Sequence, residues 1–325
     1  MASSAASMPF IKNLASSDRK IRTAALDSLK SFLTAKYAAS SATSTPLTFH
    51  DALKLWAGLF YALWMADRAP AQQRLCDELA GLPAAVKLSD SAMDAWLCAF
   101  WATMAREWTT GIDVLRMEKF MLLVRRVLHA QLAWMKDEKQ GSGKKSQPSA
   151  ARVRGLQILA QWPYNPEGEA EVESPPSEED DDSDDAAGQP PRPRKRSRKV
   201  VPTIHIPVGL TMHAVDIWVD EAEKLGLLTT AEAEGEGEEK GDKAPPLARE
   251  INAVVENLAA KTTAPAVRQR TREALEDERL PWVAGTAAPG GEESMGAGGI
   301  EGQADSDEDD DGDGAADGDW DGFND

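Results

Sequence analysis

Histidine and cysteine are scarce in this chain of 325 residues, which has four histidines and two cysteines. None of the histidines shows HxxxH spacing, and Cys76 and Cys98 form no CxxC unit. Zinc sites and disulfide frameworks depend on such residues at such spacings. The sequence therefore predicts no metal and no disulfide, and both thiols are expected to be small core residues in a reducing compartment.

Glycine-rich nucleotide-binding and nucleophile motifs are also missing. The chain has no GxxxxGK[ST], no GxGxxG after a strand and no GxSxG. Its glycine clusters and paired acids, such as Glu178-Glu179, stand in low-complexity segments that cannot hold the geometry of acid–base catalysis. We therefore expect no catalytic residues, no cofactor and no enzyme activity.

Long apolar runs are lacking as well. No run of about 18 uncharged apolar residues exists, and the first twenty residues have no apolar segment behind a basic one. The sequence thus predicts neither a membrane span nor a secretory signal.

Tryptophan, by contrast, is abundant and concentrated between residues 51 and 135. This stretch holds six of the ten tryptophans, at helical spacing and among Leu, Met, Phe and Val: Trp56, Trp64, Trp96, Trp101, Trp108 and Trp134. Each large aromatic buries about 150–250 Å². This is the part of the chain that can supply a large core, and packing there is favoured over base stacking.

Apolar periodicity predicts a series of helices joined by short loops, with no alternating strand pattern. Thr48 and Ser89 or Asp90 are expected to begin two of the helices, and Gly81 to end a third as a C′ glycine. The fold class is therefore all-α, a HEAT-like or α-solenoid-like array, although no clean sequence repeat is visible.

Composition divides the chain into six segments. We expect a Trp-rich helical domain at 8–166, a disordered acidic-then-basic insertion at 167–199, a helical element at 200–231, an acidic linker at 232–246, C-terminal helices at 247–284 and a disordered acidic tail at 285–325. The element at 200–231 is too short to fold alone, so it should dock on the Trp-rich domain.

Charge is distributed unevenly among these segments. The whole chain carries a net charge of −18, yet residues 1–166 hold 21 Lys and Arg against 13 Asp and Glu. Residues 167–191 and 285–325 hold 11 and 14 acids and no base. A basic domain with acidic segments indicates charged partners such as nucleic acid or basic proteins.

The sequence PRPRKRSRK at 191–199 is the most specific short signal. Six cations in nine residues suit the acidic groove of a nuclear import receptor: Arg192, Arg194, Lys195, Arg196, Arg198 and Lys199. The alternative is a solvated run that balances the acids before it. We favour nuclear localisation, because the segment is expected to be accessible.

Cations on the helical domain are candidates for contact with RNA phosphates or with a partner. They are Arg19, Lys20, Arg22, Arg116, Lys119, Arg125 and Arg126. The pattern fits the ordinary wet face of amphipathic helices equally well, and the sequence does not decide between these two interpretations.

Four ordered blocks resemble the eukaryotic ribosomal RNA-processing protein one family. They read MPFIKNLASSDRKIRTAALDSLKSFLTAK, LWAGLFYALWMADRAPAQQRLCDELA, FWATMAREWTTGIDVLRMEKFMLLVRRVLHAQL and IPVGLTMHAVDIWVDEAEK. The resemblance implies a helical, HEAT-like, non-catalytic nucleolar factor in assembly of the large ribosomal subunit, without which precursor rRNA cleavages fail. It also implies pre-ribosomal partners, including a Brix-domain protein and a WD-repeat propeller, and contact with pre-rRNA.

Two other functions compete with this scaffold hypothesis. The acidic segments suit a nuclear chaperone for histones or basic ribosomal proteins, although a solubilising role explains them equally well. An RNA-processing enzyme is the third possibility, and nothing in the motifs favours it.

Overall fold

The structure is a computed structural model that describes residues 10–41, 46–136, 148–172, 202–228 and 246–284. These residues all belong to one compact unit, Met1–Thr286, whereas the second unit, Ala287–Asp325, lies outside the described residues. The predicted nuclear localisation cluster at 191–199 also lies outside them.

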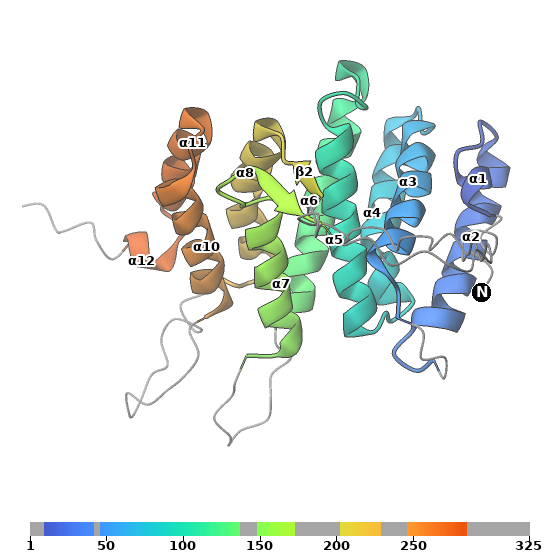
Figure 1. Ribbon diagram of the computed structural model, residues 1–325, viewed down its shortest axis with the longest axis horizontal. Helices are drawn as coiled ribbons and strands as arrows, with labels where there is room; N and C mark the ends of the chain where they lie inside the picture. Colours follow the sequence, from blue (N-terminus) through green and yellow to red (C-terminus); the bar gives the residue numbers. More distant parts are fainter. Residues whose placement is uncertain (1–9, 42–45, 137–147, 173–201, 229–245, 285–325) are drawn as a thin grey trace, which may run out of the picture. The chain divides into compact units, whose positions relative to one another are not determined.

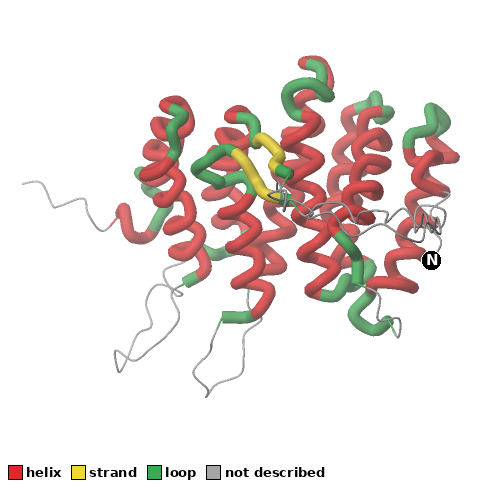
Figure 2. Tube along the Cα trace, viewed as in Figure 1, coloured by secondary structure: helices red, strands yellow, loops and turns green. Residues whose placement is uncertain are grey.

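Helices make up nearly all of the regular structure in the described ranges (Figure 1), and Figure 2 shows how little strand accompanies them. The helices are α1 (Phe10–Leu14), α2 (Arg19–Tyr37), α3 (Phe49–Trp64), α4 (Ala69–Ala85), α5 (Asp90–Glu107), α6 (Met117–Met135), α7 (Ala150–Gln161), α8 (Val208–Lys224), α10 (Leu247–Lys261), α11 (Pro265–Leu275) and α12 (Pro281–Ala284). A 3-10 turn, η2 (Val114–Arg116), precedes α6. The predicted all-α, solenoid-like class is confirmed.

The helices stack in two layers. One layer runs through α1, α3, α5, α7 and α10, each packed on the next. In the other layer α4 packs on α6, α6 on α8 and α8 on α11. Among the described helices, α2 packs mainly on α1 and lies beside α4 less closely than these pairs, so the second layer is loosest at its N-terminal end.

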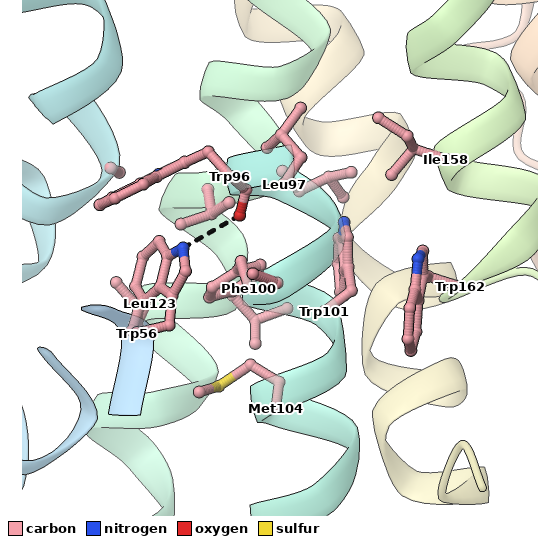
Figure 3. Packing of buried hydrophobic residues seen from close by; sticks show 14 of the residues in the cluster. Trp56, Trp96, Leu97, Phe100, Trp101, Met104, Leu123, Ile158 and Trp162 are labelled. Atoms are coloured by element: carbon pink, nitrogen blue, oxygen red, sulfur yellow. Dashed lines mark hydrogen bonds between the residues drawn. The ribbon is translucent and has the colours of Figure 1, made fainter. Parts of the chain in front are cut away.

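The Trp-rich core lies between α3 and α5. The rings of Trp56 and Trp96 are 4.9 Å apart, and the indole nitrogen of Trp56 donates to the carbonyl oxygen of Trp96 at 3.0 Å (Figure 3). Phe100 packs on the same Trp56 ring. All three side chains are almost fully buried, so the predicted tryptophan core forms where the spacing places it.

A buried polar chain connects α5, α6 and α7. Trp101 donates to the side-chain oxygen of Gln131 at 3.0 Å, and the Gln131 amide donates to the backbone oxygen of Gly155 at 3.2 Å. Gly155 is required at this crossing, because a Cβ there would lie 2.3 Å from Cγ of Met135. This chain fixes the register of three helices, since a buried polar group without its partner is costly.

Local capping confirms two of the expected helix starts and contradicts one expected end. Thr48 and Ser89 accept hydrogen bonds from the backbone nitrogens of Asp51 and Ala92 as N-caps of α3 and α5. The prediction that Gly81 ends a helix is wrong, because α4 continues to Ala85. The last turn of α4 buries Leu82 and Pro83, and this packing overrides the low helix propensity of glycine.

The helix after the insertion, α8, packs against α6. Its Trp218 is fully buried, and the hydroxyl of Tyr164 donates to the carbonyl oxygen of Ala214 at 3.0 Å. Two short strands, β1 (Glu169–Glu171) and β2 (Thr203–His205), pair antiparallel, with Glu169 opposite His205. The sequence pattern did not predict this strand pair.

Replacing Trp101 by phenylalanine is expected to lower the free energy of unfolding more than the same replacement at Trp218. Both indoles are fully buried and lose similar volume. Trp101→Phe additionally leaves the Gln131 acceptor without its donor, at a cost of about 1–3 kcal/mol. The indole nitrogen of Trp218 has no hydrogen-bond partner among the described residues. Urea unfolding followed by circular dichroism measures both variants, and equal losses would contradict the expectation.

Candidate nucleic-acid interface

The cations predicted to contact RNA or a partner separate into two groups in the structure. Arg19, Lys20 and Arg22 lie in the first turn of α2. The other four lie on or next to α6: Arg116, Lys119, Arg125 and Arg126. The two groups differ in how exposed their side chains are and in the residues that those side chains contact.

Lys119 is an internal residue, with only 5% of its surface exposed. Its ammonium donates to the backbone oxygens of Trp64 at 2.8 Å and Ala66 at 3.0 Å, where it closes the C-terminal end of α3. Burial lowers the pKa of Lys119 from its usual value. The ammonium is therefore not available to an RNA phosphate.

Arg125 joins α6 to α8. Its guanidinium donates to Asp220 and to Glu221, at 3.0 Å in each case. Glu221 is fully buried and is also contacted by His129 at 2.9 Å and Lys224 at 2.7 Å. Because a buried carboxylate requires such partners, Arg125 has a structural role.

Arg126 and Arg116 are also engaged within the fold. Nε of Arg126 lies 2.8 Å from a carboxylate oxygen of Asp77 on α4. Arg116 forms an ion pair with Asp113, and its guanidinium stands 4.6 Å from the centre of the Trp64 ring. The α6 group therefore ties this helix to its neighbours, and none of its four cations is free of intramolecular contacts.

Two cations of the α2 group, Arg19 and Arg22, line a cleft of about 540 Å³ between α2, the end of α3 and the first half of α4, whereas Lys20 is not among the lining residues. The cleft opens where the second layer is loosest, and the ion pair of Lys30 with Glu78 bridges α2 and α4 there. Its lining residues are Ser17, Arg19, Arg22, Thr23, Leu26, Ala62, Met65, Ala66, Asp67, Arg68, Ala71, Arg74, Leu75 and Glu78.

Two of these lining cations, Arg68 and Arg74, were missed in the sequence. They are six residues apart, a spacing that does not place them on one face of a helix, and no basic run marks them. Only the packing of α4 beside α2 brings them to the same cleft as Arg19 and Arg22. No local signal in the sequence could have identified them.

The chemistry that this cleft offers is the donation of hydrogen bonds to anionic oxygens. Guanidinium groups present several N–H donors in a fixed plane and match phosphate oxygens well. The nearest cleft acids are Asp67 and Glu78, and Glu78 is already paired with Lys30. Within the described ranges, no group of three or more His, Cys, Asp and Glu side chains could hold a metal ion. None of the helices there combines the length and the hydropathy of a membrane span.

The sequence of this chain is similar to those of known proteins. A family model described as "Nucleolar protein, Nop52" matches residues 5–169. The chain is 35% identical over 131 residues to ribosomal RNA processing protein 1 homolog B of Homo sapiens, and 38% identical over 133 residues to homolog A of Mus musculus. Each match covers 40% of this chain but only 17% and 26% of those relatives, so the chain corresponds to a minor part of their length.

Charge reversal is expected to separate the roles of the two adjacent arginines on α6. Arg125→Glu should reduce the free energy of unfolding by about 3 kcal/mol, because it removes a partner from a buried carboxylate. Arg126→Glu should cost about 1 kcal/mol or less, since Arg126 and Asp77 are 41% and 56% exposed. Thermal and urea unfolding of the two variants provide the measurement. Similar losses at both positions would show that Glu221 does not depend on Arg125.

Proposed function

Because the chain belongs to the Nop52 family of nucleolar proteins, we propose that it is a scaffold in nucleolar assembly of the large ribosomal subunit. In this role it holds protein partners and precursor rRNA in place, and other factors carry out the cleavages that depend on it. The observation that carries the proposal is the family match over residues 5–169, which takes in α1 to α7 and the tryptophan core. The relatives named as ribosomal RNA processing proteins support the same process.

The packing of the helices supports a scaffold role. Paired helices in two layers present surfaces at fixed spacing, and such arrays commonly provide extended binding faces. Large buried rings, including Trp56, Trp96 and Trp101, stiffen the array between α3 and α6. A rigid array loses little conformational entropy when a partner binds.

A surface for a protein partner is proposed at η2. Val114 and Leu115 are 88% and 92% exposed, far more than the other exposed large apolar side chains described. The turn is fixed, because Asp113 accepts a hydrogen bond from the backbone nitrogen of Arg116 at 3.0 Å and pairs with its guanidinium. Two apolar side chains on a fixed turn suit an apolar pocket of a protein. The only cation of the turn is paired, which makes RNA a poorer match.

The scaffold proposal is tested by sedimentation and affinity purification of the tagged full-length chain from cells. We expect the chain to co-migrate with large-subunit precursors and not with small-subunit precursors. A Brix-domain protein and a WD-repeat protein are expected among the co-purified factors. A chain that remains in the unassembled fractions contradicts the proposal.

Deletion of residues 285–325 separates the scaffold from the chaperone alternative. Retained association with pre-ribosomes supports the scaffold. Loss of all partners together with the acidic tail would instead favour a chaperone for histones or basic ribosomal proteins.

The double substitution Val114→Ser and Leu115→Ser is expected to weaken capture of a protein partner by about tenfold or more. Burying the two side chains is worth about 1.5–3 kcal/mol each, and 1.4 kcal/mol corresponds to a factor of ten. Quantitative mass spectrometry of the purified particles measures the loss. The matched control is Val153→Ser with Val208→Ser. It also removes two apolar side chains, but these are only 41% and 43% exposed and so offer a partner less apolar surface. Equal effects of the two doubles would count against η2.

A further inference from the structure

We infer that the cleft between α2 and α4 binds the phosphodiester backbone of single-stranded RNA. The inference rests on the proposed function, and it assigns the contact with precursor rRNA to one surface. The cleft volume of about 540 Å³ lies in the range of small-ligand sites, so it can hold only a short stretch of backbone.

Free positive charge gathers in this cleft. Arg19, Arg68 and Arg74 are exposed, and in the described part of the chain none of them forms an ion pair. By contrast, every α6 cation is engaged within the fold. Glu78 forms an ion pair with Lys30, so Asp67 is the remaining carboxylate in the lining. The cleft therefore presents more unpaired guanidinium groups than carboxylates.

The fourth arginine is held in place. Arg22 is half-buried, and its guanidinium donates to the backbone oxygens of Ser16 and Ser17, at 2.8 Å in each case. These bonds fix the side chain at the cleft wall. A fixed guanidinium loses less side-chain entropy on binding an anion than a mobile one.

One wall of the cleft is also the start of a helix without a side-chain cap. α4 starts one residue after Arg68, which provides no capping side chain, whereas the Asp18 carboxylate caps α2 by accepting a hydrogen bond from the backbone nitrogen of Lys20. The N-terminus of α4 carries partial positive charge, which adds to the field of the arginines. The guanidinium cluster carries the inference, and this dipole contribution reinforces it.

The floor of the cleft indicates which part of the RNA is bound. It is formed by small and aliphatic side chains, among them Leu26, Ala62, Ala66 and Leu75, and none of the lining residues is aromatic. A floor without rings provides no stacking platform for bases. Recognition is therefore of phosphate and sugar, and it is independent of sequence.

An acidic peptide fits these donors less well than RNA does. A peptide brings one backbone N–H per residue that needs an acceptor. The walls are helices whose backbone oxygens are mostly bonded within the helix, so they provide few such acceptors. An RNA backbone instead brings mainly acceptor oxygens, which match guanidinium groups that only donate.

The test measures binding of a fluorescent oligouridine of about 20 nucleotides to the purified full-length chain, over a series of potassium chloride concentrations. Arg68→Glu with Arg74→Glu is expected to weaken binding by about tenfold or more. The slope of log K against log salt should fall in magnitude by about 1.4, because each lost phosphate contact to a single strand contributes about 0.7. The double Arg68→Gln with Arg74→Gln should give a smaller loss of affinity and a similar change in slope.

The matched control is Lys261→Glu with Arg272→Glu, which makes the same change in net charge on α10 and α11. Both side chains are exposed, and neither forms an ion pair within the described ranges. In this control the affinity for the oligouridine should change by less than about twofold. The control and the cleft variants should have the same melting temperature.

Three results would overturn the inference. The first is an equal loss of RNA affinity in the cleft variant Arg68→Glu with Arg74→Glu and in the control variant. The second is unchanged RNA affinity in both cleft variants, with Glu and with Gln. The third is displacement of the RNA from the wild-type chain by an equimolar oligo-aspartate peptide. The last result would assign the cleft to an acidic protein segment. Co-migration of the wild-type chain with large-subunit precursors is measured separately. If the cleft proves not to bind RNA, the scaffold proposal is unaffected. If the wild-type chain does not co-migrate with large-subunit precursors, the scaffold proposal is contradicted.

Discussion

The fully buried carboxylate of Glu221 is the constraint on which much of this structure depends. A charge removed from water is tolerated only when partners surround it, and here Arg125, His129 and Lys224 do so. Two of these partners come from α6, so the carboxylate fastens α8 to α6 across the insertion. It also withdraws cations from the face of α6, and the unpaired arginines are left at the other end of the layer, beside α2.

A second buried polar group plays a comparable part between the two layers. Gln131 lies between Trp101 and the backbone of Gly155, so α5, α6 and α7 can meet in only one register if its hydrogen bonds are to be satisfied. The tryptophans supply most of the apolar burial, but apolar packing alone tolerates sliding. The amide supplies the specificity that a purely apolar seam would lack.

Much of the fold could be predicted from the sequence, because apolar periodicity and capping residues act locally. The tryptophan core and the caps Thr48 and Ser89 formed as expected. Gly81 failed as a helix end because burial of Leu82 and Pro83 is a tertiary effect. The candidate site could be predicted less well from the sequence. Whether Arg125 meets solvent depends on Glu221, nearly a hundred residues away, and Arg68 reaches the cleft only through the packing of α4 beside α2.

The strand pair also has a consequence for how the length of the chain can vary. Glu171 faces Thr203, and the backbone nitrogen of Val172 donates to the oxygen of Pro202 at 2.9 Å, so the two residues that flank the segment 173–201 lie side by side. Doubling the number of residues between two fixed points of a chain costs only about 0.6 kcal/mol. A change in length between Val172 and Pro202 therefore need not disturb the packing of the helices on either side. The same point would accept a reporter domain without separating α7 from α8.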